Sequence, residues 1–213
     1  MDNVTRIFFL IDRSGSMAPL RQAVIDGYNN FMEEQKTGDG ECYVTMYQFD
    51  DKFEVHRINE SPSNYEPLSY TSYEPRGGTA LLDAIAHAIE SAKPTINPTD
   101  KVVFIIHTDG AENASTIYKN RFGDVAKMIS NYRDELGWQF VYFGAGLDAI
   151  GEANKLQIGN SNVTRNTYAS YTTSMDFTAN KVKALRSLTS NNAQACGAVM
   201  SYSAEEKKQM EQS

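Results

Sequence analysis

The stretch Arg6–Met17, RIFFLIDRSGSM, holds the two features that decide the fold of this 213-residue chain. Its first half, Arg6–Ile11, is a continuous apolar run, which is typical of a strand covered on both faces of a sheet. Its second half is a short polar loop that leads into Pro19–Gln35, where apolar residues recur at helical spacing. A buried strand followed by an amphipathic helix predicts the start of an alternating α/β fold.

The same alternation continues along the chain. Continuous apolar runs predict two more buried strands, and helical periodicity predicts the helices that follow them. Two further runs are joined by the short turn Asp50-Asp51-Lys52 and predict an antiparallel hairpin at a sheet edge. The expected strands are 6–11, 42–49, 53–59, 101–107, 138–143 and 163–168, and the expected helices are 19–35, 79–93, 122–136, 147–156 and 174–189. We therefore predict a doubly wound α/β fold, with a mostly parallel central sheet of about six strands and helices on both faces.

Length and composition set the domain organisation that we expect. Hydrophobic residues make up 41% of the chain, which suffices for a sizeable core. We predict one domain over residues 1–190 and a polar tail over residues 191–213. In that tail, Ser203 and Glu206 have the spacing of a capping box for a short terminal helix.

The net charge and the cysteine content indicate which kinds of partner to expect and in which cellular compartment the protein acts. The formal net charge of −7, with no cluster of Lys and Arg, argues against nucleic acid. The apolar stretch Ile7–Ile11 is too short for a signal peptide, and no run approaches a membrane span, so we expect a cytoplasmic protein that does not enter membranes. Cys42 and Cys196 fit no metal or redox spacing. We interpret both as packing residues, with a disulfide as the less favoured alternative.

Oxygen-bearing side chains alternate directly after the first strand. Asp12, Ser14 and Ser16 can converge in one tight turn because Gly15 lets the chain bend. One carboxylate and two hydroxyls meet part of the need of Mg²⁺ for oxygen ligands. The pattern alone has another explanation, because Asp and Ser also cap the N-termini of helices.

Two other segments supply matching groups. Asp109 follows a buried run, as Asp12 does, and Gly77-Gly78-Thr79 brings another hydroxyl to the start of a helix. If the two strands are neighbours, their carboxylates approach the same point and repel each other unless a positive charge lies between them. The three segments together predict a site for one divalent metal ion.

At these residues the sequence resembles a known family. Asp-x-Ser-x-Ser, a separate Thr before a helix, and Asp-Gly after a central strand look like the metal-ion-dependent adhesion site (MIDAS) of von Willebrand factor A (VWA) domains. All five positions match, and they are Asp12, Ser14, Ser16, Thr79 and Asp109. The resemblance covers about residues 6–168. It is strongest to small stand-alone cytoplasmic VWA proteins of bacteria and their phages, and it implies a Rossmann-like sheet.

The resemblance also implies how the site works. Ser14 and Ser16 would bind the metal directly, Asp12 and Asp109 often through water, and Thr79 directly or through water. The expected ion is Mg²⁺, with Mn²⁺ possible, and a protein partner would supply an Asp or Glu as the sixth ligand. We therefore predict a binding module rather than an enzyme. The alternative is a Mg²⁺-dependent hydrolase that acts on a phosphorylated substrate, although the motif loops lack a paired acid and base.

Other residues near the motifs have two interpretations each. His107 could be an acid or base, but we favour a hydrogen-bonded core residue. Glu112 could touch the water shell of the metal, but we favour a solvated carboxylate. Arg13 is expected to point outward, where it could contact a partner or have no role. The tyrosines in Tyr65–Tyr73 could form a recognition surface or pack the loop down, and the sequence does not decide between these roles.

Overall fold

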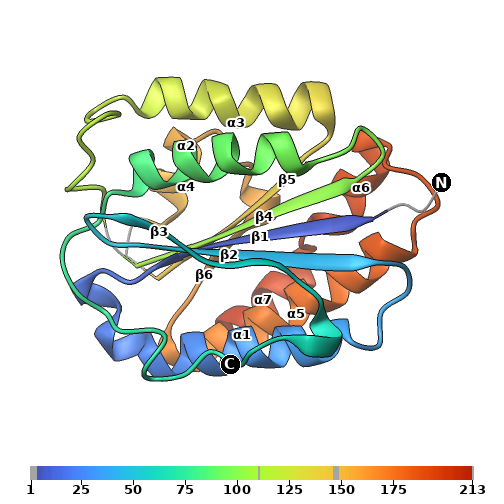
Figure 1. Ribbon diagram of the computed structural model, residues 1–213, viewed down its shortest axis with the longest axis horizontal. Coiled ribbons are helices and arrows are strands. Elements are labelled where there is room, and N and C mark those ends of the chain that lie inside the picture. The colour runs from blue at the N-terminus through green and yellow to red at the C-terminus, as the bar shows by residue number, and fades with distance from the viewer. Residues whose placement is uncertain (1–3, 110, 146–148, 213) are drawn as a thin grey trace.

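The computed structural model describes residues 4–109, 111–145 and 149–212 and contains a six-stranded sheet between two layers of helices (Figure 1). The strand order is β3-β2-β1-β4-β5-β6. Every pair of neighbours is parallel except β2 and β3, which form the antiparallel edge. The predicted fold class is confirmed. The strands are β1 Thr5–Asp12, β2 Cys42–Phe49, β3 Phe53–Glu60, β4 Lys101–Thr108, β5 Gln139–Gly144 and β6 Val163–Arg165.

Helices cover both faces of the sheet because alternate residues of each strand point to opposite sides. Phe8 and Leu10 of β1 belong to the core cluster between the sheet and α2, α3 and α4, whereas Ile7 and Phe9 belong to the cluster between the sheet and α1 and α5. These two groups of helices lie on opposite faces of the sheet (Figure 1). The helices are α1 Arg21–Gln35, α2 Leu81–Ala92, α3 Phe122–Leu136, α4 Ala149–Lys155, α5 Tyr168–Ser187, α6 Ala193–Met200 and α7 Ala204–Gln212. Short 3₁₀ helices are η1 Gly15–Leu20, η2 Pro62–Asn64, η3 Lys93–Thr95 and η4 Asn160–Asn162.

The last part of the chain contains more structure than the sequence predicted. Helix α6 was not predicted, and it adds Cys196 and Met200 to the core cluster that also includes residues of α1 and α5. Helix α7 begins as predicted, because the Ser203 hydroxyl and the Glu206 carboxylate each accept a hydrogen bond from the other residue's backbone N–H. The proposed domain boundary at residue 190 stays a prediction.

A buried lysine fixes the C-terminal end of α5 to the central sheet. Lys101, the first residue of β4, is 2% exposed, and its Nζ donates hydrogen bonds to the carbonyl oxygens of Leu185 at 2.9 Å and Arg186 at 3.0 Å, and to that of Leu188. The last carbonyls of a helix have no partner within the helix, and a cation suits their partial negative charge. Lys101 therefore completes the hydrogen bonding of α5 from the neighbouring layer.

The two cysteines do not form a disulfide. Cys42 and Cys196 are both buried and free, so their interpretation as packing residues is confirmed. Among the described residues, no helix is both long and apolar enough to cross a membrane.

Candidate metal centre

Three loops meet at the carboxyl ends of β1 and β4, where ligands bind in open α/β sheets. The parallel register pairs Ile11 with His107, so the residues that follow on each strand lie side by side. The strand order changes direction between β1 and β4. From β1 the chain runs outward through β2 and β3 to one edge of the sheet, and from β4 it runs outward through β5 and β6 to the other edge. The loop before α2 crosses the same edge and donates the Arg76 N–H to the Arg13 carbonyl at 2.6 Å.

Asp12 is fully buried at this edge, with 0% exposure. Its Oδ1 accepts a hydrogen bond from the Ser14 N–H at 2.6 Å, and its Oδ2 accepts one from the Thr108 hydroxyl at 2.7 Å. Burial raises the pKa of Asp12 to about 6, and the nearby carboxylate of Asp109 acts in the same direction. The negative charge of Asp12 is therefore costly in the absence of a cation.

Two serine hydroxyls connect Asp12 to the second carboxylate. The Oγ atoms of Ser14 and Ser16 lie 3.0 Å apart, and the Ser16 hydroxyl donates to Asp109 Oδ1 at 2.7 Å. Asp109 is partly buried, and this burial raises its pKa. The structure thus brings Asp12, Ser14, Ser16 and Asp109 together in one chain of contacts.

The backbone of Thr79 is hydrogen-bonded to the segment that follows Asp109. The Thr79 N–H donates to Asn113 Oδ1 at 2.9 Å, and its carbonyl accepts the N–H groups of Asn113 and Ala114 at 3.0 and 3.1 Å. On the other side, the Gly15 N–H donates to the Gly77 carbonyl at 3.2 Å. The loop that carries Thr79 is therefore bonded both to the loop of the serines and to the segment after Asp109.

The chemistry of these groups suits a hard divalent cation. They offer carboxylate and hydroxyl oxygens, which Mg²⁺ and Mn²⁺ prefer. Among the described residues, no three His, Cys, Asp or Glu side chains lie close enough together to hold a metal ion by themselves. Hydroxyl ligands would therefore be an essential part of a metal site here, as the sequence pattern also indicates.

Comparison with known proteins places the chain in a family. A family model for the von Willebrand factor type A domain matches residues 7–191. The chain belongs to this family. No sequence relative was found among curated proteins.

Solved structures share the VWA fold at low sequence identity. Proximal thread matrix protein 1 from the mussel byssus is 18% identical with a TM-score of 0.57, over 84% of this chain and 46% of that one. The ArnB paralog VWA2 from Sulfolobus acidocaldarius is 16% identical with a TM-score of 0.59, over 83% and 45%. A second structure of the mussel protein, with a zinc-occupied MIDAS motif, is 17% identical with a TM-score of 0.56, over 85% and 46%. This VWA domain thus spans less than half the length of these proteins.

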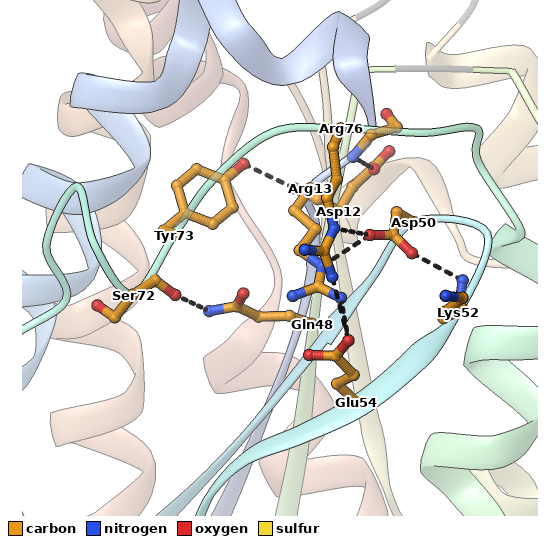
Figure 2. Close-up of polar contacts among 10 residues, drawn as sticks. Asp12, Arg13, Gln48, Asp50, Lys52, Glu54, Ser72, Tyr73 and Arg76 are labelled. Atoms are coloured by element: carbon orange, nitrogen blue, oxygen red, sulfur yellow. Dashed lines mark hydrogen bonds and ion pairs between the residues drawn. The ribbon is translucent and has the colours of Figure 1, made fainter.

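Arg13 does not point outward, so this expectation was wrong. The residue is 7% exposed, and its Nε donates to Asp50 Oδ2 at 3.0 Å (Figure 2). A terminal nitrogen of its guanidinium also lies 2.5 Å from Glu54 Oε1. Asp50 and Glu54 therefore balance the charge of Arg13 on the side of the β2–β3 turn.

His107 is a core residue of the VWA sheet, as favoured from the sequence. It is 1% exposed, its Nδ1 is hydrogen-bonded to the Tyr171 hydroxyl, and its ring stacks on Phe143 with centroids 4.6 Å apart. Complete burial lowers its pKa to about 3, so the imidazole stays neutral at physiological pH.

Glu112 is not simply a solvated carboxylate, contrary to the interpretation that we favoured. Its Oε2 accepts the Leu82 N–H at 2.9 Å and the Ser115 hydroxyl at 2.7 Å, so it caps the start of α2. Asp83, which the sequence analysis missed, accepts the backbone N–H groups of residues 116, 117 and 118. Its position in the first turn of a helix was the available signal. Both carboxylates hold the segment after Asp109 against α2.

Of the tyrosines in Tyr65–Tyr73, one packs the loop against the site and another is exposed, and a role in recognition stays a prediction. Tyr73 is fully buried, and its hydroxyl donates to the Asp12 carbonyl at 2.7 Å (Figure 2). Tyr70 is 53% exposed and lies against the Arg21 guanidinium, 4.4 Å from ring centroid to Cζ. Tyr73 thus supports the backbone of the site, whereas Tyr70 presents its ring to solvent.

Proposed function

We propose that this VWA domain is a metal-dependent protein-binding module. One divalent cation, Mg²⁺ with Mn²⁺ as the alternative, is held by the MIDAS residues Asp12, Ser14, Ser16, Thr79 and Asp109. A partner protein then binds through an acidic side chain. The observation that carries this proposal is the pair of carboxylates joined through Ser14 and Ser16, with the adjacent Arg13 directed to other acidic residues.

The charge of these groups explains why the partner would be acidic. Two carboxylates and neutral hydroxyls leave a bound dication with open coordination positions, which a carboxylate from outside can fill. Without a cation, the same carboxylates repel an acidic partner. Recognition would therefore depend on metal. The zinc-occupied MIDAS motif of the mussel protein supports the capacity of this fold to hold a divalent ion at this motif.

Addition of Mg²⁺ or Mn²⁺ is expected to raise the melting temperature of the protein. A ligand that binds only the folded state stabilises it by mass action, by about 1.4 kcal/mol at ten times the dissociation constant. In a domain of this size that corresponds to a rise of roughly 3–6 °C. Differential scanning fluorimetry with millimolar metal, followed by excess EDTA, measures the rise and its reversal. A melting curve that ignores both additions would contradict the proposed site.

Affinity capture from the native cell can identify the partner. The immobilised protein is incubated with lysate in Mg²⁺ and then eluted with EDTA, alongside an immobilised Asp109→Asn variant. Proteins eluted by EDTA from the parent but missing from the variant are candidates. Neutralising the acidic residues of a candidate one at a time should abolish binding at one of them. Capture that is equal with and without metal would contradict a metal-dependent interface.

We further propose that the protein binds rather than catalyses and that it acts in the cytoplasm. The neutral, buried His107 supports the first proposal, because it offers no accessible acid or base beside the carboxylates. The two free thiols support the second, because a reducing compartment preserves them. A screen of phosphatase and nucleotidase substrates with Mg²⁺ tests the hydrolase alternative. Turnover that disappears in an Asp12→Asn variant would favour the hydrolase instead.

A further inference from the structure

The segment that delivers Thr79 to the site has little rigidity of its own. Gly77 has a φ of +67°, which side-chain-bearing residues rarely adopt, and a Cβ there would lie 2.6 Å from Asp51 Oδ1. A Cβ on Gly78 would lie 3.0 Å from Asn113 Oδ1. Two consecutive glycines let the chain pass between the β2–β3 turn and the segment after Asp109. The Gly77 carbonyl accepts the Gly15 N–H and the Thr79 backbone is bonded to Asn113, so the contacts on either side of the glycines complete the positioning of this segment.

Asp50 holds both ends. On one side of the glycines, its Oδ2 accepts a hydrogen bond from Arg76 Nε at 3.0 Å (Figure 2). On the other side, its backbone carbonyl accepts the Ala80 N–H at 2.9 Å. Asp50 itself is 1% exposed, and its Oδ1 accepts the Lys52 N–H at 2.8 Å, so its carboxylate has a fixed orientation.

Asp50 and Arg76 also contact Arg13, which belongs to the loop that carries Ser14 and Ser16. Arg13 lies between the proposed ligands Asp12 and Ser14, and its Nε reaches the same Oδ2 of Asp50 at 3.0 Å. The Arg76 N–H donates to the Arg13 carbonyl at 2.6 Å, and the Arg76 side chain also contacts Glu54 Oε1 at 3.2 Å. One buried carboxylate thus links the two arginines that adjoin the two hydroxyl-bearing loops (Figure 2).

We propose that Asp50 and Arg76 are positioning residues of the metal centre, which hold the Gly77-Gly78-Thr79 segment at both ends and so place the Thr79 hydroxyl at the cation. This inference rests on the proposed function. Groups that orient metal ligands typically change metal affinity about 10- to 100-fold when they are removed. Arg76 is the better of the two for a test, because its side chain is 53% exposed and its loss leaves no hole in the core.

The first experiment measures Mn²⁺ affinity by isothermal titration calorimetry. Arg76→Ala is expected to bind Mn²⁺ about tenfold more weakly than the parent, while its melting temperature without metal stays close to that of the parent. Arg76→Lys keeps one charged donor for Asp50 and should recover part of the affinity. Arg121→Ala is the matched control, since Arg121 is also 53% exposed and also pairs with a carboxylate, that of Asp124. Its Mn²⁺ affinity should equal that of the parent.

A double-mutant cycle with Thr79→Ala then tests whether Arg76 acts through Thr79. If it does, the double variant binds Mn²⁺ no more weakly than Thr79→Ala alone, because the hydroxyl that Arg76 positions is already missing. Strictly additive losses, or an Arg76→Ala variant with parental affinity, would overturn the positioning role and leave the metal site standing. A parent protein that does not bind Mn²⁺ would overturn both proposals.

Discussion

An Asp12→Asn variant is expected to lose its response to Mg²⁺ while its metal-free form is as stable as the parent or slightly more stable. Asp12 is fully buried, and burial raises its pKa to about 6. Because this folded-state pKa exceeds that of an unfolded aspartate, about 3.9, the ionised carboxylate opposes folding at neutral pH. Asn removes the charge and keeps the shape. Its amide oxygen can accept the Ser14 N–H, and its NH₂ can donate to the Thr108 hydroxyl.

The pH dependence supplies an internal check on this result. Below pH 6 the parent takes up a proton at Asp12, so the advantage of the metal-free variant should be present at pH 7.5 and shrink at pH 5. Melting curves with and without Mg²⁺ at both pH values measure these differences. Asp124→Asn, which removes a charge that is 53% exposed, is the control and should keep its full response to metal. Normal partner binding by the Asp12→Asn protein, unchanged by EDTA, would contradict the metal site and show that Asp12 only caps the following helix.

The largest loss of stability is expected for Lys101→Met. Methionine replaces the aliphatic stem but removes the donor that serves the carbonyls of Leu185, Arg186 and Leu188. The Leu185 carbonyl keeps the Leu188 N–H as a donor. Buried acceptors that lose a charged donor cost about 1–3 kcal/mol each when nothing replaces it, so the loss of the other two bonds amounts to roughly 3 kcal/mol after partial relaxation. That corresponds to a fall of about 6–12 °C in the melting temperature.

A second lysine tests whether the loss of stability in Lys101→Met comes from the buried position of Lys101 or only from the loss of a positive charge. Lys183 lies on α5 itself and pairs with Glu34 at the surface, where its side chain is 28% exposed. Lys183→Met should change the melting temperature by little, because exposed ion pairs contribute weakly. Lys101→Met should still respond to Mg²⁺, since Lys101 lies at the opposite end of β4 from Asp109. Equal losses in the two variants would contradict the role assigned to Lys101.

The regular elements were predictable where local chemistry agreed with the fold. Helix α3 has the predicted bounds, Phe122–Leu136, because Gly137 adopts a left-handed conformation that ends it. Helix α6 was missed because its eight residues, AQACGAVM, are mostly small and apolar on every side and so give a weak periodic pattern, and its packing depends on distant parts of the core. The Asn192 side chain, which accepts the Ala195 N–H, was a local signal that could have indicated this helix.

At the candidate site, the sequence predicted that the two carboxylates would come together with the two serines but not how the neighbouring residues would pair. Motifs at the ends of β1 and β4 predicted the approach of Asp12 and Asp109, because parallel neighbours present the same ends. The burial of Arg13 depends on Asp50, which lies 37 residues away, and no local pattern reveals such a pairing. The same holds for Glu112, whose hydrogen bond to Leu82 N–H spans 30 residues. Long-range polar contacts were the part that required the structure.

Because β1 lies beside β4, the candidate metal centre joins two points of the chain that are far apart in sequence. Asp12 and Thr108 touch across these strands although 96 residues separate them in sequence. With a cation bound as proposed, Asp12 and Asp109 become the two ends of a reversible cross-link that encloses α1, β2, β3, α2 and β4 in one loop. Because the ion leaves when the chain unfolds, this link adds its binding free energy to the stability of the folded state and places no restriction on the unfolded chain. Unlike a disulfide, this one can be opened by a chelator and is indifferent to the redox state of the compartment.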